Sequence, residues 1–137
     1  MRIERIYDIT EIMKCLPMER EIRKKHRDDS RESDTLLFIQ TQLQNPFFGF
    51  WIAYGDKDEI IGYTCGILSN IIGMERLIVL RLYSKNKEVT NKFLEIGKEW
   101  AKQYKVKLMQ IVVKKHAMAF KRIFKFVPVS IVMERRI

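Results

Sequence analysis

The sequence predicts a mixed α/β (α+β) fold, in which a central, mostly antiparallel sheet of about six strands is flanked by about four helices. Two observations lead to this expectation. Three consecutive segments rich in aromatic and β-branched residues are separated by short turns, which is typical of hairpin strands. The hydrophobic period then changes to that of a helix, and strand-like and helix-like segments alternate toward the carboxyl end, which favours strand–helix–strand crossovers.

The expected strands are, in order, 2–7, 47–54, 59–68, 74–83, 106–115 and 130–136. GDKD at 55–58 separates the second from the third and predicts a β-hairpin, and Asn70 to Gly73 predicts a further turn. The strand 47–54 carries aromatic side chains that alternate along it, and we expect them in the core: Phe47, Phe48, Phe50, Trp51 and Tyr54.

Helices are expected over 11–16, 35–44, 90–104 and around 116–124. Asp8 and Glu11 have the spacing of a capping box before the first helix, and Pro17 ends that helix or begins the next one. Ser33 is the expected cap of the helix 35–44. The helix 90–104 has the clearest period, with one apolar face formed by Phe93, Gly97, Trp100, Ala101 and Tyr104.

Residues 18–34 (MEREIRKKHRDDSRESD) are almost wholly charged. Only Met18 and Ile22 are available for burial, so we expect a solvated helix or loop there.

The composition indicates one domain, residues 1–137, because 47% of the 137 residues are hydrophobic, enough for a sizeable core. No run reaches the roughly 18 apolar residues that cross a bilayer, and the amino terminus is charged where a signal peptide is apolar. We therefore expect a cytoplasmic protein that does not enter a membrane. Cys15 and Cys65 lie far apart, with His26 and His116 as the only histidines, so we expect buried thiols and no metal site.

The formal net charge of +9 predicts attraction to anions. Nucleic acid, an acidic protein surface and a phosphorylated cofactor all satisfy it, and the charge alone does not choose among them.

Residues 82–93 (LYSKNKEVTNKF) connect the strand 74–83 to the helix 90–104. A strand that leads directly into a helix across a short polar loop is a common phosphate site, because the helix begins with free N–H groups. This connection, however, contains no glycine.

The order of the elements, with FLEIGKEWAKQYKVKLMQIVV at 93–113 and SIVMERRI at 130–137, resembles the GNAT superfamily of acyl-CoA-dependent N-acyltransferases over essentially the whole chain. The family's pyrophosphate loop, of the form Arg/Gln-x-x-Gly-x-Gly/Ala, falls on residues 86–91 when it is counted back from Trp100. Each of its glycines is replaced here. The family's late tyrosine falls near Lys121, and its Gly-Phe pair falls on Lys125 and Phe126.

The resemblance implies that acetyl-CoA or another acyl-CoA is the cosubstrate, with its pyrophosphate on backbone N–H groups of the loop and of the helix that follows. The positions that it assigns to this cosubstrate are Leu80, Leu82, Ser84, Lys85, Asn86, Lys87, Val89, Thr90, Asn91 and Lys121. Val89 and Asn91 stand where glycines are expected, so they strain the loop or obstruct the ligand. Lys85 and Lys87 offset part of this loss, because a lysine holds phosphate as a point charge.

Transfer to an amine also needs a base for the ammonium proton and an acid for the leaving thiolate. The resemblance places Glu75 in the region of the base. Tyr83 is not at the family's tyrosine position, but it can substitute for that tyrosine sterically, so we expect it to be the acid.

The expected function is that of a divergent GNAT-type N-acyltransferase acting on an amine of unknown identity. One alternative is a GNAT fold that has lost catalysis and binds a protein partner. Another is a basic nucleic-acid-binding protein, with the lysines at 85, 87, 114, 115, 121 and 125, although no recognised motif accompanies them. A homodimer is compatible with an open sheet, and 130–137 is its expected edge strand.

Overall fold

The computed structural model describes residues 1–26, 31–70, 72, 75–112, 117–129, 133 and 135. Within this part of the chain the strands are β1 (Arg2–Arg5), β2 (Phe48–Tyr54), β3 (Ile60–Ser69), β4 (Arg76–Ser84) and β5 (Met109–Ile111). The helices of the same part are α1 (Ile9–Met13), α2 (Leu16–His26), α3 (Glu32–Gln42), α4 (Lys87–Gln103) and α5 (Ala117–Arg122). The order agrees with the prediction, and the charged segment forms α2 between two of the expected helices.

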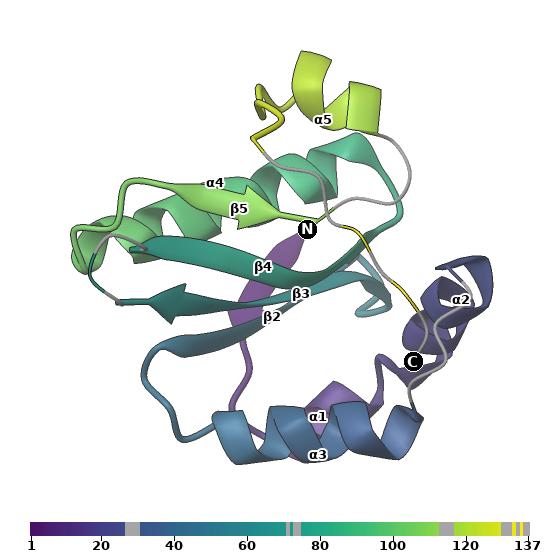
Figure 1. Ribbon diagram of the computed structural model, residues 1–137. Helices are drawn as coiled ribbons and strands as arrows, with labels where there is room; N and C mark the ends of the chain where they lie inside the picture. Colours follow the sequence, from purple (N-terminus) through teal and green to yellow (C-terminus); the bar gives the residue numbers. More distant parts are fainter. Residues whose placement is uncertain are drawn as a thin grey trace.

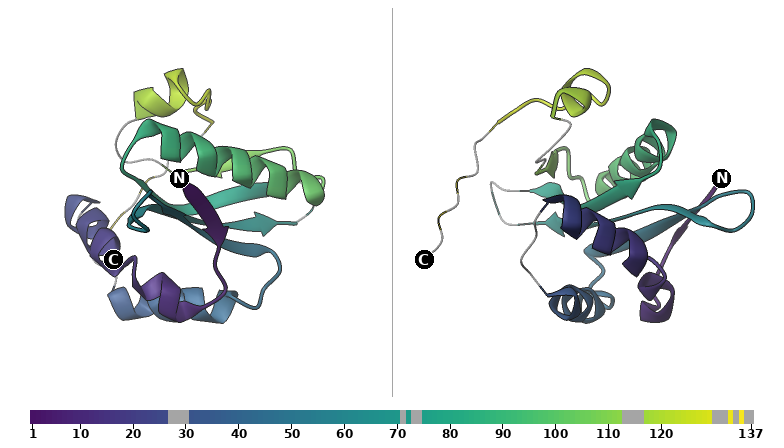
Figure 2. Two further views of the ribbon diagram at one scale, coloured as in Figure 1. Left: turned by 180° about the vertical axis from the view of Figure 1, so that it is seen from behind. Right: turned by 90° about the vertical axis from the view of Figure 1, so that its right-hand side faces the viewer.

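The described strands form one sheet in the order β1-β2-β3-β4-β5 (Figure 1). The first four strands pair antiparallel, and β5 pairs parallel to β4. The α4 helix covers one face of this sheet, while α1 and α3 lie on the other face and α2 lies beside β4 (Figure 2). This arrangement confirms the mixed, mostly antiparallel sheet that the sequence predicts.

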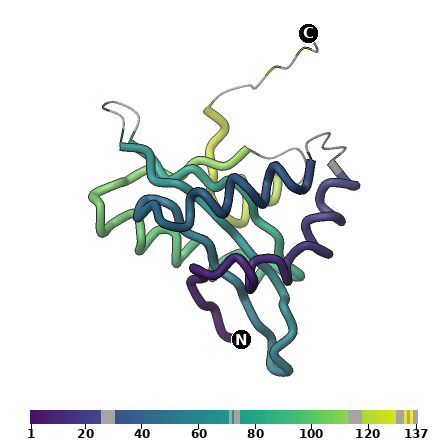
Figure 3. The backbone as a smooth tube through the Cα atoms, turned by 90° about the horizontal axis from the view of Figure 1, so that it is seen from below, coloured from purple at the N-terminus to yellow at the C-terminus, as the bar shows by residue number. Residues whose placement is uncertain are grey.

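The core has two halves, one on each face of the sheet. Phe50, Ile52 and Tyr63 face α1 and α3, which Figure 3 shows in front of the sheet, whereas Trp51 and Ala53 face α4. All residues of β2 are buried, because both faces of this central strand are covered. The prediction that the aromatic residues of 47–54 belong to the core is therefore confirmed, with Phe47 partly buried.

Cys15 and Cys65 are confirmed as buried thiols of the half-core on the α1 and α3 side of the sheet. Burial raises the pKa of each thiol to about 12, so both stay protonated at neutral pH.

Two helices begin at residues other than those that the sequence predicts. The expected cap Ser33 lies inside α3, whose N-cap is the extended Arg31; Glu32 and Asp34 then place negative charge in the first turn, where the helix dipole favours it. The α4 helix begins at Lys87 rather than Thr90, because the side chain of Asn86 caps it. Asp8 is confirmed as the cap of α1, and α2 begins before Pro17.

The charged segment is less solvated than predicted. Glu19 and Arg23 of α2 are buried with relative exposures of 5% and 9%, although only Met18 and Ile22 were expected to be buried. Glu19 contacts Tyr63 of β3 and Arg81 of β4, and Arg23 pairs with Glu19, so ion and hydrogen-bond partners replace water.

Several predictions lie wholly or partly outside the described residues. They are the turn at 70–73, the end of the strand 106–115 beyond Val112, and most of the strand 130–136 with the dimer edge assigned to it. No helix in the described ranges is long and apolar enough to cross a bilayer.

The α4 helix approaches the sheet closely at Gly62 of β3. A Cβ atom at this position would lie 2.7 Å from the carbonyl oxygen of Tyr83 and 2.9 Å from a methyl carbon of Val89. We expect Gly62→Ala to lower the free energy of unfolding by about 1–3 kcal/mol, as overpacking does. Urea denaturation measures this change. Gly55→Ala is the control, because its Cβ meets the end of the Glu59 side chain, which can move. Equal stability of the two variants would contradict the close approach.

Candidate functional site

The edge of β4 that faces β5 is paired only in part within the described residues. There, parallel pairing with β5 covers Leu77 to Val79, and no described strand pairs with the five residues of β4 that follow, up to Ser84; we call these five residues the open edge. The amide of Lys85 donates to Ile61 of β3 at 2.9 Å. Since successive residues of a strand turn their N–H and C=O groups to opposite edges, Ser84 and Leu82 turn theirs to the open edge, away from β3. An extended ligand can hydrogen-bond to such an edge as an added strand does.

A β-bulge lies at the start of this open edge. Opposite the neighbours Cys65 and Gly66 of β3, the partners on β4 are Arg81 and Val79, so Leu80 is the extra residue. Leu80 packs against the half-core on the α1 and α3 side of the sheet. Arg81 contacts Glu19 of α2 on that same side. The bulge thus turns two consecutive side chains to the α2 side and bends the strand directly after Val79, the last residue of β4 that pairs with a described residue of β5.

The open edge ends at the amino terminus of α4. The side-chain oxygen of Asn86 accepts a hydrogen bond from the amide of Val89 at 3.0 Å. In the part of the chain that the structure describes, the amides of Lys87 and Glu88 have no acceptor. Two N–H groups and the positive end of the helix dipole therefore remain for an anion, with the exposed Lys85 and Lys87 beside them.

The connection between β4 and α4 is shorter than predicted. Only Lys85 and Asn86 lie outside both elements, so the residues aligned with the glycine loop form the helix cap and first turns. The residues with positive φ other than glycine, within the described ranges, are Asp58, Lys105 and Lys125. No residue of this connection therefore needs the conformation that favours glycine.

Two expected contacts of the cosubstrate are corrected by burial. Val89 has a relative exposure of 1% and packs in the half-core under α4, so its side chain does not obstruct the helix terminus, contrary to the expectation from the sequence. Thr90 is also buried, and its hydroxyl is hydrogen-bonded to that of Ser84. Asn91 is exposed on the second turn of the helix.

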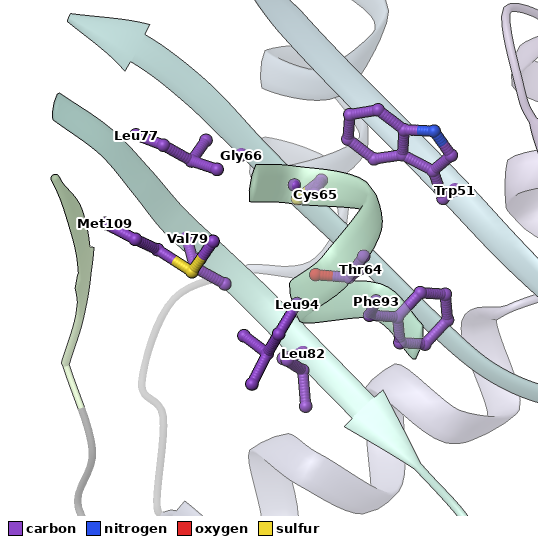
Figure 4. A pocket seen from close by; sticks show the side chains of 11 residues that line it. Trp51, Thr64, Cys65, Gly66, Leu77, Val79, Leu82, Phe93, Leu94 and Met109 are labelled. Carbon is purple, nitrogen blue, oxygen red and sulfur yellow. The ribbon is translucent and has the colours of Figure 1, made fainter. Parts of the chain in front are cut away.

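An apolar cavity of about 20 Å³ lies between α4 and the sheet, beside the opening. Figure 4 shows Val79 and Leu82 of β4 facing Met109 of β5 and Leu94 of α4 across it. The rest of its lining comes from Trp51, Thr64, Cys65, Gly66, Leu77, Phe93 and Gly97.

Several solved structures with the same architecture are acetyltransferases of low sequence identity to this chain. An aminoglycoside 6'-N-acetyltransferase from Acinetobacter baumannii matches with a TM-score of 0.77 at 12% identity, over 98% of this chain and 96% of that one. A predicted acetyltransferase from Clostridium acetobutylicum, solved with acetyl-CoA, matches with a TM-score of 0.78 at 12% identity, over 98% and 95% of the chains. No family model matches the sequence, and no curated protein does. The chain has the GNAT fold.

Within the GNAT fold, the structure brings most of the predicted site residues together. Leu80 to Asn91 follow one another along the open edge and the first turns of α4. Glu75 instead precedes β4 at the end where β5 is paired, so the structure does not bring it to the opening. Lys121 is exposed on α5, on the same side of the sheet as α4 (Figure 1).

Tyr83 lies on the α2 side of β4. Its hydroxyl donates to Oε2 of Glu21 at 3.4 Å, and its ring stacks on that of Tyr63 with centroids 6.1 Å apart. Partial burial and the nearby carboxylate of Glu21 raise the pKa of Tyr83, which is therefore protonated at neutral pH. A proton donor with a carboxylate partner thus lies beside the opening.

Lys125 has a backbone conformation that favours glycine. Lys125, which is aligned with the glycine of the Gly-Phe pair, has a φ of 59°. This is the left-handed conformation that glycine adopts without strain.

A group of polar residues on the α2 side of the sheet was not predicted from the sequence. The buried residues Glu19, Arg23 and Tyr63 and the half-buried Arg81 form a cluster around the Glu19 carboxylate. The i,i+4 spacing of Glu19 and Arg23 was visible in the sequence, but their burial depends on partners far along the chain.

The cap at Asn86 fixes where α4 begins and so where its free amides lie. We expect Asn86→Ala to lower the free energy of unfolding by about 1 kcal/mol, because the amide of Val89 loses its acceptor. Urea denaturation measures the loss. Asn86→Asp is the matched control, because aspartate caps a helix equally well. A loss of the same size in both variants would contradict the role of the cap.

Proposed function

We propose that the protein is an acyl-CoA-dependent N-acyltransferase that takes acetyl-CoA or a related thioester and acylates an amine. The observation that supports this proposal most is the open edge of β4, which leads without interruption to the free amides of α4. An acyl-CoA has an extended arm with amide groups, and this arm ends in a pyrophosphate. The arm matches the open edge of β4, and the pyrophosphate matches the free amides at the start of α4. The GNAT fold of the chain, which acetyltransferases share, agrees with the proposal.

The residues present fit a pyrophosphate, although they hold it differently from a glycine loop. Lys87 and Glu88 supply two backbone donors, and the side chains of Lys85 and Lys87 supply two positive charges. The carboxylate of Glu88, in the first turn, repels an anion. Together Lys85, Lys87 and Glu88 still carry a net charge of +1, which attracts the pyrophosphate. In this proposal, binding of the pyrophosphate depends more on side-chain charge than on its close approach to the backbone.

The acceptor in this proposal approaches from the α2 side of the opening. Its nitrogen attacks the thioester carbonyl after the ammonium has lost a proton, and the carbon–sulfur bond then breaks. Tyr83 is placed to protonate the leaving thiolate, and Glu21 is the carboxylate that contacts Tyr83. Glu21 therefore replaces Glu75 as our candidate for the base.

The proposed binding of the pyrophosphate is tested by titrating acetyl-CoA into the protein in a calorimeter. We expect micromolar affinity in the wild type and a loss of about 10²-fold in Lys85→Glu with Lys87→Glu, because two charge-assisted contacts become repulsive. Lys98→Glu with Lys107→Glu is the matched control, since it changes the net charge equally at exposed positions away from the start of α4.

Two results would contradict this binding mode. One is the absence of binding at millimolar acetyl-CoA, and the other is an equal loss of affinity in both double variants. Unchanged affinity in the control variant shows that the lysines at the start of α4 act locally.

The acid is tested by Tyr83→Phe. We expect kcat to fall by about 10²-fold, as on loss of a general acid, while the Kd for acetyl-CoA stays within about twofold. Release of free thiol from acetyl-CoA in the presence of a panel of primary amines measures the rate. Tyr104→Phe, at the opposite end of α4, is the control. A Tyr83→Phe enzyme with wild-type kcat would remove this residue from the mechanism.

The short connection also favours a second candidate, a catalytically inactive GNAT-fold protein that binds a protein partner. The same assays distinguish the two, because this candidate predicts no thiol release with any amine. For the nucleic-acid alternative, Lys114 and Lys115 lie outside the described residues.

A further inference from the structure

The buried ionic cluster on the α2 side is centred on one carboxylate. Oε1 of Glu19 lies 3.2 Å from Nε of Arg81 and 3.3 Å from Nε of Arg23, and Oε2 accepts a hydrogen bond from the hydroxyl of Tyr63. Glu19 has a relative exposure of 5%. A carboxylate taken out of water costs several kcal/mol unless ion pairs and hydrogen bonds replace its hydration, and here they do. The cluster ties α2 to β3 and β4.

Arg81 connects this cluster to the bulge of β4. Its Nη1 donates to the carbonyl oxygen of Leu80 at 3.1 Å, and the hydroxyl of Thr64 donates to the carbonyl oxygen of Arg81 at 2.7 Å. Both carbonyl groups of the bulge are thus held by side chains. A bulge lacks regular ladder bonds, so its conformation depends on such contacts.

The next main-chain groups along the strand are those of Leu82, on the open edge. Their direction follows from the bend at Leu80 and Arg81, because the bulge sets the phase of the residues after it. An error of about 1 Å in the placement of a reacting group can cost about 10²-fold in rate.

The same cluster also orients Tyr83. The ring of Tyr63, whose hydroxyl is hydrogen-bonded to Glu19, stacks on the ring of Tyr83 at an interplanar angle of 17°. One carboxylate therefore supports both the bulge and the side chain that we assign as proton donor.

We infer that Glu19 and Arg81 are positioning residues for acyl transfer, which fix the bulge at Leu80 and thereby the edge of β4 that receives the thioester. This inference rests on the proposed function. Stability alone does not account for a buried ion cluster, because apolar residues of similar volume stabilise a core equally well.

Glu19→Gln tests the inference, because it keeps the volume of the side chain and removes its charge. We expect kcat to fall by about 10²-fold while the Kd for acetyl-CoA changes by less than about threefold. Hydrogen–deuterium exchange of residues 78–84 should also become faster, with exchange of β2 unchanged. Glu32→Gln is the matched control. Glu32 and Glu19 line one small pocket between the helices and the sheet, but Glu32 pairs with Arg20 at 2.9 Å and no contact of Glu32 with the bulge is found among the described residues.

Arg81→Lys is the second variant, and it decides the matter if Glu19→Gln does not fold. It keeps a positive charge near Glu19 but loses the fork that donates to the carbonyl of Leu80. Faster exchange confined to 78–84 in Glu19→Gln or Arg81→Lys supports the inference. Wild-type exchange in the folded variants, or a change that Glu32→Gln shares, overturns it. If the wild type binds acetyl-CoA but acylates no amine, the proposed function fails, and the exchange experiment still decides whether the cluster holds the bulge.

Discussion

The contact between α4 and the sheet at Gly62 is the constraint on which the site depends. Because β3 has no side chain there, Val89 and Phe93 approach its backbone closely, and the helix begins almost directly after β4. On the side of the first turns of α4 that faces the sheet, Val89 and Thr90 are buried. The free amides of Lys87 and Glu88 consequently lie at the end of the open edge of β4.

The two faces of the sheet are chemically different around this opening. On the α4 side the lining is apolar, with Val79, Leu82 and Met109 around a small cavity. On the α2 side a buried carboxylate, two arginines and two tyrosines surround the bulge. A thioester bound between β4 and β5 would have its apolar parts on one side and proton-transferring groups on the other. This asymmetry is a stronger argument for acyl transfer than the basic charge of the whole chain.

The sequence predicts the sheet and α4 well because their signals are local. Alternating aromatic residues along β2 and the apolar face from Phe93 to Trp100 repeat within a few residues. The buried face of α2 could not be predicted in this way. Glu19 is separated by 44 residues from Tyr63 and by 62 from Arg81, so no local pattern shows that its charge is compensated. The start of α4 was predictable in principle, since Val89 lies four residues before Phe93 and continues the apolar face.

The missing glycines acquire a different meaning once the backbone is known. Glycine is needed where φ is positive or where a ligand must approach the backbone closely. Here Asn86 is extended, with φ of −154° and ψ of 170°, and the residues after it are helical, so no side chain between Ser84 and Asn91 strains the chain. What the cap does remove is one donor, because the amide of Val89 is bonded to Asn86. In the function that we propose, Lys85 and Lys87 replace that donor with charge, and charge on exposed side chains is screened by salt where backbone donors are not. The absence of glycine therefore changes how an anion is held at this helix and does not by itself exclude binding.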